Sequence, residues 1–433
     1  MWQKIKRKCL AALLVIVVIM QEPSLLRAGK LNWGNACAVK EMISGQDTGS
    51  DNTVSVCYYL NGGVLEGSSG KTYGQEELPV EFGVPAREGY NFAGWYTESS
   101  FTHKVSRLET VHAGEYKLYA KWTRKIDGDY NVQMYPYQNA AVSEGSEKKL
   151  KNCDYRFLEQ VRIPGMPGTR EEDAKENRIT ETSQYPQGIC ITDEYLLVSA
   201  YSGEKGGGLG CIHVFDRKTG TYCATIGTKK NSHMGGLAFD GKRIWVCHSG
   251  SGTLGCIPYS YVRQVASRMP QSVVDCSASF EEYNVSNTPS CIAFYDGMIW
   301  VATHTKLFCS RMAAYQMTER GLKQVKSCRI PDKVQGIVFD EEGRVYVSTS
   351  FGRKKSSYLK VYESCSKMDE HPNRPMVKIE MPPCSEEIEL ADGQIYVLFE
   401  SAGEKYFEGT DGKGKSIAPV DQVLLLERES VLE

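Results

Sequence analysis

The chain has 433 residues, with 51 Lys and Arg against 53 Asp and Glu, and a formal net charge of −2. A mildly acidic chain without a basic stripe argues against nucleic acid as a partner. The 15 cysteines include no Cys-x-x-Cys pair, which argues against a zinc ribbon or a thioredoxin-like site. Disulfides between them stay open, and their connectivity cannot be read from spacing.

The N-terminus has the pattern of a secretory signal peptide. Four basic residues precede position 9, and an unbroken apolar run follows over residues 9–20. This run is shorter than the roughly 18 residues that a membrane-spanning helix needs. With the small residue Ala28, the pattern predicts a signal peptide over 1–28 and a short leader over 29–50. An uncleaved anchor is the alternative, because Leu26-Arg27-Ala28 is a poor cleavage site.

Residues 51–124 read as a compact β module. Asn61-Gly62-Gly63 is a hairpin signal between short strands. Large aromatic side chains, Trp95 and Trp122 among them, can fill the core of so small a unit. A sugar-binding platform is the functional alternative for these tryptophans, but small domains need their large aromatic residues inside.

This module resembles a known family. It contains Asn61-Gly62-Gly63, then the block Arg-Glu-Gly-Tyr-Asn-Phe-Ala-Gly-Trp-Tyr over 87–96, then Leu-Tyr-Ala-Lys-Trp over 118–122. The same blocks in the same order mark the Listeria–Bacteroides repeat, the internalin-type B-repeat of bacterial cell-envelope proteins. The resemblance implies a β-grasp-like fold on an exported surface protein.

A polar linker is expected over 125–153, and a propeller over 154–433. Five phased strand–turn–strand copies begin at Ile189, Leu237, Ile292, Ile337 and Ile388, which are 48, 55, 45 and 51 residues apart. Repeats of this length built from strands are typical of propeller blades. Asp-Gly pairs at 240–241, 296–297 and 392–393 suit the tight turns. The fold class is therefore all-β, a small β-grasp-like repeat module plus a five-bladed β-propeller.

The last blade runs out of chain after its third strand, near Val423–Leu426. Upstream of the first blade, residues 159–164 look like the missing fourth strand. We therefore expect Val161 and Ile163 to pair with Val423–Leu426 and close the ring. In blade pattern the propeller resembles YncE- or NHL-type propellers.

Ligand-binding candidates follow the second strands of the copies, because strand ends and their loops line the faces of a propeller. They are Tyr201, His248, His304 and Ser350. Two histidines are not a metal cluster, so no metal site is expected. No Ser-His-Asp order or nucleophile elbow is present, so no catalytic residue is named. No cofactor is expected.

Residues 409–416 match the phosphate-loop pattern Gly-x-x-x-x-Gly-Lys-Ser in letters, with Lys415 as its lysine. A phosphate loop needs a preceding buried strand and a following helix. Pro419 follows within three residues, so we expect a solvated loop here and no nucleotide.

The leading interpretation is a secreted or cell-envelope-associated, non-enzymatic binding or adhesion-type protein. Its ligand, a surface glycan or a protein, would bind at a propeller face, with association to the cell wall possible. A propeller glycan hydrolase or lyase is the first alternative, and a structural surface spacer is the second. An enzyme would need two or three convergent titratable groups at the channel mouth.

Overall fold

The computed structural model describes residues 53–67, 71–99, 103–110, 112, 114–124, 132–137, 147–166, 184–203, 208–268, 273–307 and 310–433. The expected signal peptide and leader, residues 1–50, lie outside this set. None of the described helices is long and apolar enough to cross a membrane.

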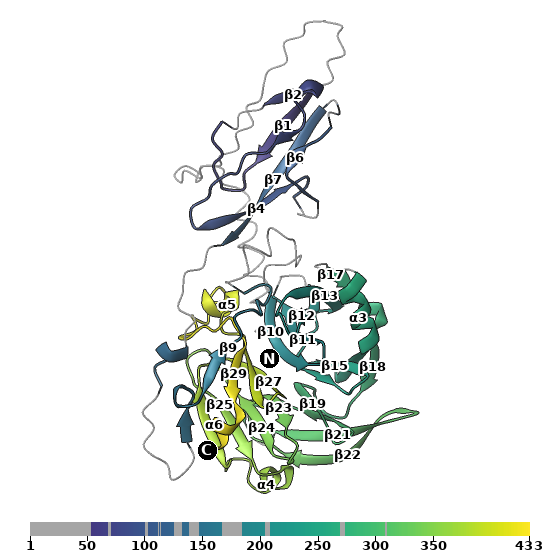
Figure 1. The fold of residues 1–433 in the computed structure, drawn as a ribbon, viewed down its shortest axis with the longest axis vertical. Helices are drawn as coiled ribbons and strands as arrows, with labels where there is room; N and C mark the ends of the chain where they lie inside the picture. Colours follow the sequence, from purple (N-terminus) through teal and green to yellow (C-terminus); the bar gives the residue numbers. More distant parts are fainter. Residues whose placement is uncertain are drawn as a thin grey trace, which may run out of the picture.

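The strands coloured purple to blue in Figure 1 form the N-terminal module. A five-stranded sheet has the order β2-β1-β7-β4-β5, and β3 pairs with β6 beside it. The bounds are β1 (Thr53–Tyr59), β2 (Thr72–Gly74), β3 (Val80–Glu81), β4 (Tyr90–Tyr96), β5 (Lys104–Val105), β6 (Arg107–Leu108) and β7 (Gly114–Arg124).

Aromatic residues fill the core of the module, as expected from the sequence. Trp95 is buried and donates its indole N–H to the Gly83 carbonyl at 2.8 Å. Trp122 is half-buried and donates to the Leu60 carbonyl at 2.9 Å. Both tryptophans therefore stabilise the fold, and their indole N–H groups are hydrogen-bonded within the module.

Five mainly antiparallel sheets form the propeller, coloured teal to yellow in Figure 1 apart from the blue strands that residues 147–157 add. Blade one consists of β10 (Gln184–Ile191), β11 (Tyr195–Ser202), β12 (Leu209–Asp216), β13 (Tyr222–Lys230) and the parallel outer strand β17 (Val273–Asp275). Blade two consists of β14 (Leu237–Phe239), β15 (Arg243–His248), β16 (Thr253–Pro258) and β18 (Glu281–Asn284).

Blade three consists of β19 (Cys291–Tyr295), β20 (Met298–Ala302), β21 (Arg311–Thr318) and β22 (Gly321–Arg329). Blade four consists of β23 (Val334–Phe339), β24 (Val345–Thr349), β25 (Ser357–Tyr362), β26 (Val377–Met381) and the parallel outer strand β8 (Glu147–Lys149). Blade five consists of β27 (Ser385–Ala391), β28 (Gln394–Phe399), β29 (Leu424–Glu427) and β9 (Tyr155–Phe157). The stretch expected to be a linker thus contributes β8 to the propeller.

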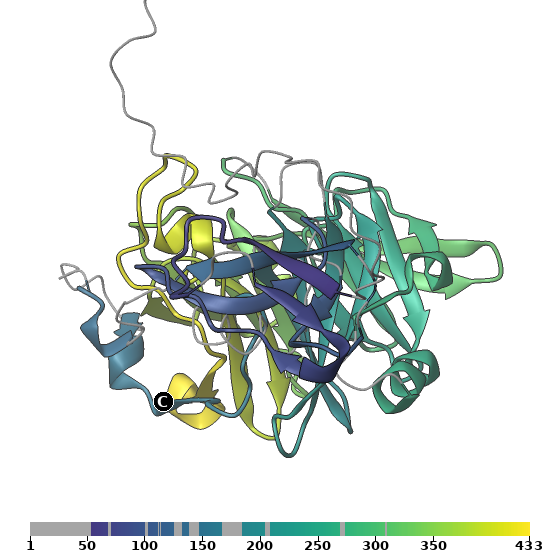
Figure 2. The same ribbon diagram turned by 90° about the horizontal axis from the view of Figure 1, so that it is seen from above.

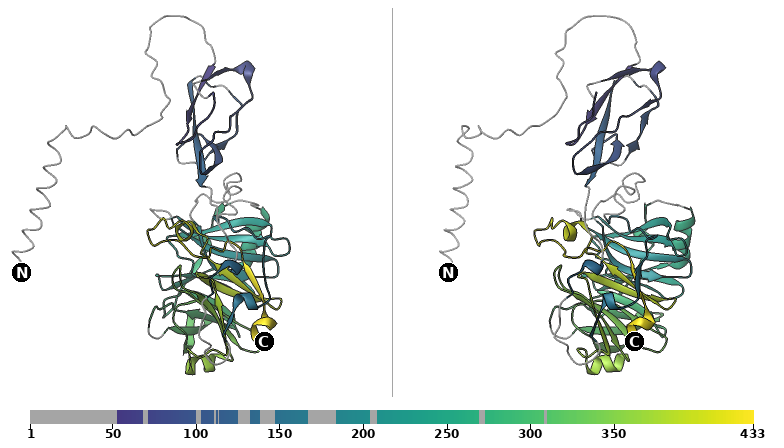
Figure 3. Two further views of the ribbon diagram at one scale, coloured as in Figure 1. Left: turned by 90° about the vertical axis from the view of Figure 1, so that its left-hand side faces the viewer. Right: turned by 60° about the vertical axis from the view of Figure 1, so that its left-hand side comes forward.

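Helical segments are short and lie outside the sheets. They are α3 (Tyr259–Arg268), α4 (Cys365–Glu370), α5 (Glu404–Phe407), α6 (Arg428–Leu432), η1 (Gln75–Glu77), η2 (Val132–Met134), η3 (Leu150–Asn152) and η5 (Ser277–Ser279). The amphipathic α3 packs on β13 and β16 at the outer rim of the first two blades, as Figures 1 and 2 show. In contrast, α5 and α6 lie at opposite ends of the last blade (Figures 1 and 3).

Two of the three Asp-Gly turns are confirmed, whereas at 240–241 only Gly241 has a positive φ, of 86°. Asp296 and Gly297 have φ of 51° and 68°, and Asp392 and Gly393 have 54° and 73°. Paired positive φ values are those of the tight hairpin turn whose twist matches the flanking strands.

The ring closes on itself. The first strands of the blades, β10, β14, β19, β23 and β27, each contact the next, and β27 contacts β10. Blade five is completed from upstream, because β9 pairs antiparallel with β29 through Leu424–Phe157 and Leu426–Tyr155.

The prediction that a segment upstream of the first blade closes the ring is therefore confirmed, but the predicted pairing residues are wrong. Val161 and Ile163 do not pair with β29, because the chain turns at 159–160 after β9. Their side chains are buried instead between blades five and one, beside Val198 and Leu425.

Candidate functional site at the mouth of the central channel

The axis of the propeller is filled by one acidic side chain. Glu387 of β27 is fully buried, and its Oε2 accepts hydrogen bonds from the backbone N–H of Ile189 (2.9 Å) and Leu237 (2.8 Å). Glycines of neighbouring blades make room for it. A Cβ at Gly236 would lie 2.4 Å from Glu387 Oε1, and one at Gly336 would lie 2.7 Å from Glu387 Cα. Burial raises the pKa of Glu387 well above its usual range.

Three bulges aim polar side chains at one mouth of this channel. Strand register shifts around Gln187 in β10, around Gln335 in β23, and over Glu386 and Glu387 in β27. A bulge re-aims a side chain that a regular strand would direct elsewhere. Gln335 and Glu386 line a hollow of about 550 Å³ at this mouth.

Two buried carboxyl groups meet here. Glu386 and Glu400, which are 3% and 8% exposed, are hydrogen-bonded to each other. Gln335 Nε2 donates to both Glu386 oxygens at 2.9 Å, and Gln187 Nε2 donates to Glu400 Oε2 at 2.9 Å. Burial, followed by the charge of Glu400, raises the pKa of Glu386 well above its usual range. Because adjacent carboxylates cannot both ionise readily, the pair holds one proton.

A lysine stands beside the carboxyl pair in an aromatic cage. Lys405 Nζ of α5 lies 4.5, 4.7 and 4.5 Å from the ring centres of Tyr185, Tyr201 and Tyr406, and it donates to the Tyr201 hydroxyl. Burial lowers the pKa of Lys405, although the charge of Glu400 opposes that shift. The site thus pairs a cation with a carboxyl group in a partly buried setting, where charges act strongly on a ligand.

An ion pair holds the loop over residues 409–414 against the rim. Arg353 is 8% exposed and donates to both Asp411 oxygens, at 2.8 and 2.5 Å. The same guanidinium donates to the Gly414 carbonyl at 2.5 Å and lies over the Tyr406 ring at 4.5 Å. This bidentate pair fixes one wall of the hollow.

The same loop carries the letters of a phosphate-loop motif. It lies between α5 and β29, and the next described helix after it is α6. The strand-to-helix turn that cradles phosphate is therefore not formed at Lys415.

Three of the four predicted site residues lie at this mouth. His304 and Ser350 line the hollow, and Tyr201 forms one side of the lysine cage. His304 Nδ1 bonds the Val334 carbonyl at 3.0 Å, which leaves Nε2 as an acceptor. Ser350 Oγ accepts from Ser357 Oγ and from the backbone N–H of Cys384.

His248 does not line this hollow. It is 2% exposed, and its Nδ1 bonds Ser232 Oγ at 2.7 Å. Burial lowers its pKa to about 4, so the ring is neutral at pH 7. Among the described residues, no three His, Cys, Asp or Glu side chains gather as a metal site would require.

Glu386, Glu400 and Lys405 are site residues that were not predicted from the sequence. The signal for Glu386 and Glu387 lay in the residues just before each blade start. Those pairs are Gln187-Gly188, Gly235-Gly236, Ser290-Cys291, Gln335-Gly336 and Glu386-Glu387. In the last blade both positions hold an acidic residue, whereas the other blades have small or amide-bearing residues there. This difference between the blades marks the residues that line the channel.

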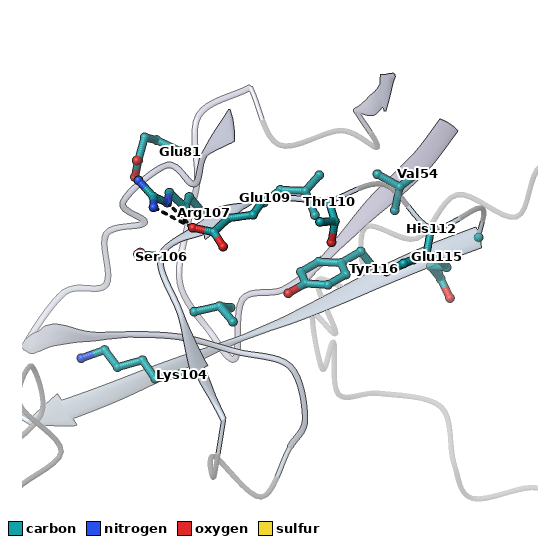
Figure 4. Close-up of a pocket in the computed structure, with 13 residues that line it drawn as sticks. Val54, Glu81, Lys104, Ser106, Arg107, Glu109, Thr110, His112, Glu115 and Tyr116 are labelled. Atoms are coloured by element: carbon teal, nitrogen blue, oxygen red, sulfur yellow. Dashed lines mark hydrogen bonds and ion pairs between the residues drawn. The ribbon is translucent and has the colours of Figure 1, made fainter. Parts of the chain in front are cut away.

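A second hollow, of about 610 Å³, lies in the N-terminal module (Figure 4). Its charged side chains are exposed, and Arg107 pairs with Glu109 at 2.6 Å across its rim. Exposed, mutually paired charges contribute little specificity. The channel mouth is therefore the stronger candidate site, because its polar groups are buried and convergent.

Comparisons with known proteins address the two units separately. Residues 55–121 match the Listeria–Bacteroides repeat domain. This repeat is typical of surface or extracellular bacterial proteins. No curated protein matches the chain.

The solved structures that are similar to the chain include two at low identity. One is the glutaminyl cyclase of Myxococcus xanthus, with 11% identity, a TM-score of 0.37, and coverage of 59% of this chain and 94% of that one. The other is the PQQ-bound aldose sugar dehydrogenase of Streptomyces coelicolor, with 11% identity, a TM-score of 0.37, and coverage of 63% and 98%.

Proposed function

We propose that this chain is a secreted or cell-envelope-associated binding protein that holds a polar surface ligand, a glycan or a protein, at the mouth of the propeller channel. One observation carries the proposal. Buried and half-buried charged and aromatic side chains of blades four and five converge on a single hollow, among them Arg353, Glu386, Glu400, Lys405 and Tyr406. Tyr201 of blade one contacts Lys405 beside it. A concave site with a few fixed polar groups and perturbed pKa values is the usual form of a ligand site.

The expected location follows from the Listeria–Bacteroides repeat together with the N-terminal sequence. Export through a signal peptide over residues 1–28, with association to the cell wall, fits both. Fractionation of the producing cells tests this part of the proposal. Full-length protein found solely in the cytoplasm contradicts it.

The carboxyl geometry favours binding over glycoside hydrolysis. Hydrolases place their two carboxyl groups about 5–5.5 Å or about 6.5–9.5 Å apart, on opposite sides of the scissile bond. Glu386 and Glu400 bond each other directly and are also held by Gln335 and Gln187. A sugar ring cannot enter between two groups in hydrogen-bond contact.

A lyase is the second candidate, on a different observation. The Tyr201 hydroxyl bonds Lys405 Nζ, and Arg353 lines the same hollow. Lys405, whose pKa is lowered by burial, would take a proton from the carbon next to a carboxylate, and the leaving group would depart from the β-carbon as a double bond forms. The Arg353 cation would attract the carboxylate. Incubation with polygalacturonate tests this candidate, because the unsaturated product absorbs ultraviolet light.

Binding is tested with immobilised neutral, acidic and amino oligosaccharides and with envelope peptides. We expect at least one probe to bind saturably, and Lys405→Met to weaken it about tenfold or more, because a charge-assisted hydrogen bond is lost. Lys323→Met is the matched control, since Lys323 is exposed on β22 in blade three.

If every probe fails, or if Lys405→Met binds as the wild type does, the channel mouth is not the binding site. A protein that binds none of the probes but still mediates cell-surface assembly supports the structural spacer instead. We also propose that the propeller is related to YncE- or NHL-type propellers. An experimental structure tests this, because its blade order and channel residues should then match those of such propellers.

A further inference from the structure

A lysine-lined hollow lies beside the channel mouth, where blades three and four meet. Its cavity volume is about 600 Å³. Loops after β20 and between β22 and β23 form one side, and strands β25 and β26 form the other. Five lysines line it: Lys306, Lys333, Lys355, Lys360 and Lys378.

One carboxylate, Asp332, stands among the described lining residues, and it is already bound. It accepts hydrogen bonds from Thr305 Oγ1 at 2.9 Å and from Ser310 Oγ and N, both at 3.2 Å. These bonds tie the loops of blade three together. The hollow therefore carries a clear excess of positive charge.

The placement of the Lys360 ammonium is not explained by a contribution to folding. It lies on β25, partly buried, and its ammonium makes no hydrogen bond or ion pair with any described residue. Burial, followed by repulsion from Lys378 and Lys333, lowers its pKa to about 8. The charge of Asp332 opposes this shift without pairing with the ammonium. A partly desolvated cation without a hydrogen-bonded partner is unfavourable for the fold and favourable for an anion that enters the hollow.

The surrounding lysines are held in place by neighbouring rings. Lys378 Nζ lies 4.2 Å from the ring centre of Tyr358 and pairs with Glu147 at 2.9 Å. Lys306 and Lys333 lie over the Phe351 ring, at 5.6 and 5.4 Å. Their positions are therefore set before any ligand arrives, which reduces the ordering that binding requires.

The lysine-lined hollow and the channel mouth form a continuous lining. Lys306, Ser350, Phe351 and Lys355 line both. Phe351 is 38% exposed at this shared edge and adds apolar surface between the two hollows. The exposed amide of Asn373 supplies a hydrogen-bonding partner of the kind that sugar hydroxyls use.

We propose that this hollow binds the carboxylate or sulfate groups of an acidic saccharide whose neighbouring sugar unit occupies the channel mouth. The inference rests on the proposed function in that both hollows hold one ligand. Nucleic acid fits less well, because the charge is gathered in a concave hollow on a chain of net charge −2 and does not form a stripe.

The experiment measures dissociation constants by titration calorimetry for a heparin-derived tetrasaccharide, tetragalacturonate and neutral cellotetraose. We expect an acidic probe to bind more tightly than cellotetraose. Lys360→Met should weaken that binding about tenfold or more, because one charged contact is lost. Lys360→Met keeps the length of the side chain and removes only its charge, so folding is preserved.

Two further variants distinguish binding at this hollow from a nonspecific effect of the protein's surface charge. Lys355→Met, at an exposed lysine of the same hollow, should also weaken the acidic probe and should flatten its dependence on salt. Lys323→Met, at an exposed lysine of β22, should change neither.

Several outcomes overturn the inference. It fails if no acidic saccharide binds, if Lys360→Met leaves the affinity unchanged, or if inorganic sulfate alone displaces the saccharide at equal concentration. It also fails if a DNA oligonucleotide binds through Lys360 more tightly than the saccharides do. If cellotetraose binds, and only Lys405→Met abolishes its binding, the proposed function stands and the inference about the lysine-lined hollow fails.

Discussion

At the scale of single residues, Glu387 shows how one departure from a repeat can define the centre of a propeller. Gly188, Gly236 and Gly336 occupy the matching position in three other blades, and their missing side chains leave space around the axis. Glu387 fills that space and accepts two backbone N–H groups. The carboxyl group thereby joins blades one, two and five at the axis.

We therefore expect Glu387→Ala to destabilise the protein by about 2–4 kcal/mol, because two buried N–H donors lose their acceptor. Glu387→Gln should stay within about 1 kcal/mol of wild type, since an amide oxygen can accept the same bonds. Urea unfolding gives both values. Glu341→Ala, at an exposed site on the turn before β24, is the control, and equal stability of Glu387→Ala and this control would contradict the role of Glu387.

The Glu386–Glu400 pair predicts a pH dependence of stability. The folded protein holds a proton on Glu386 more tightly than the unfolded chain does, because burial and Glu400 raise the pKa of Glu386. The stability from this group is therefore present below the unfolded pKa, about 4.3, and is lost as pH rises toward the folded value.

Glu386→Gln removes this titration and keeps a donor for Glu400. Between about pH 5 and pH 8, its free energy of unfolding should fall less than that of wild type, by about 1 kcal/mol or more. Urea unfolding across this range measures the difference, and Glu341→Gln is the matched control. Parallel pH profiles for wild type and Glu386→Gln would show that the pair does not share a proton.

At the scale of elements, repeats and turns could be predicted from sequence, but strand register and bulges could not. Alternating apolar residues located β10, β15, β20, β24 and β28 because burial of one sheet face imposes a period of two. The bulges at Gln187 and Gln335 produce no such period in the sequence, because packing at the axis determines where a strand takes up one extra residue. The register of closure was missed for the same reason, because Val161 and Tyr155 are equally apolar candidates.

Strand β9 should be essential to the propeller. Deleting residues 154–157 removes the partner of β29 and exposes an edge in blade five, so the melting temperature of the propeller should fall by several degrees, about 4 °C or more. Arg156→Ala, which trims an exposed side chain of the same strand, should leave it nearly unchanged. Circular dichroism measures both, and an unaltered melting temperature after the deletion would refute closure through β9.

Between β22 and α4, two cysteines are placed to form a disulfide. Cys365 Sγ lies 3.2 Å from Cys328 Sγ, and this contact lowers the pKa of Cys365. Oxidised glutathione should convert both thiols to one disulfide, with release of two reduced glutathione molecules, and stabilise the protein by about 3–4 kcal/mol. Peptide mapping without reductant checks the linkage, and Cys365→Ser should abolish both effects. A different cysteine partner would contradict the pairing.

At the scale of the whole molecule, the fold could be predicted from the sequence to a greater extent than the site could. The module carries sequence blocks in a fixed order and the propeller copies carry a period, so both β units could be predicted. The site joins residues far apart in the chain, such as Gln187 and Glu400, which meet only because the ring closes. Lys405 lies on the short helix α5 and Arg353 in a loop, both between strands, where no period marks a functional side chain.

The two units have separate hydrophobic cores, and this predicts separate unfolding. The core of the module lies within residues 54–122, whereas the propeller clusters begin at Val132, and no described core residue is shared. Calorimetry should therefore show two transitions, the smaller one from the module. Deleting residues 1–124 should remove that transition and move the propeller transition by less than about 2 °C. Trp95→Ala, which empties the core of the module alone, is the matched control and should lower only the smaller transition. A single transition, or a propeller shift of about 5 °C or more on deletion, would mean that the units fold as one.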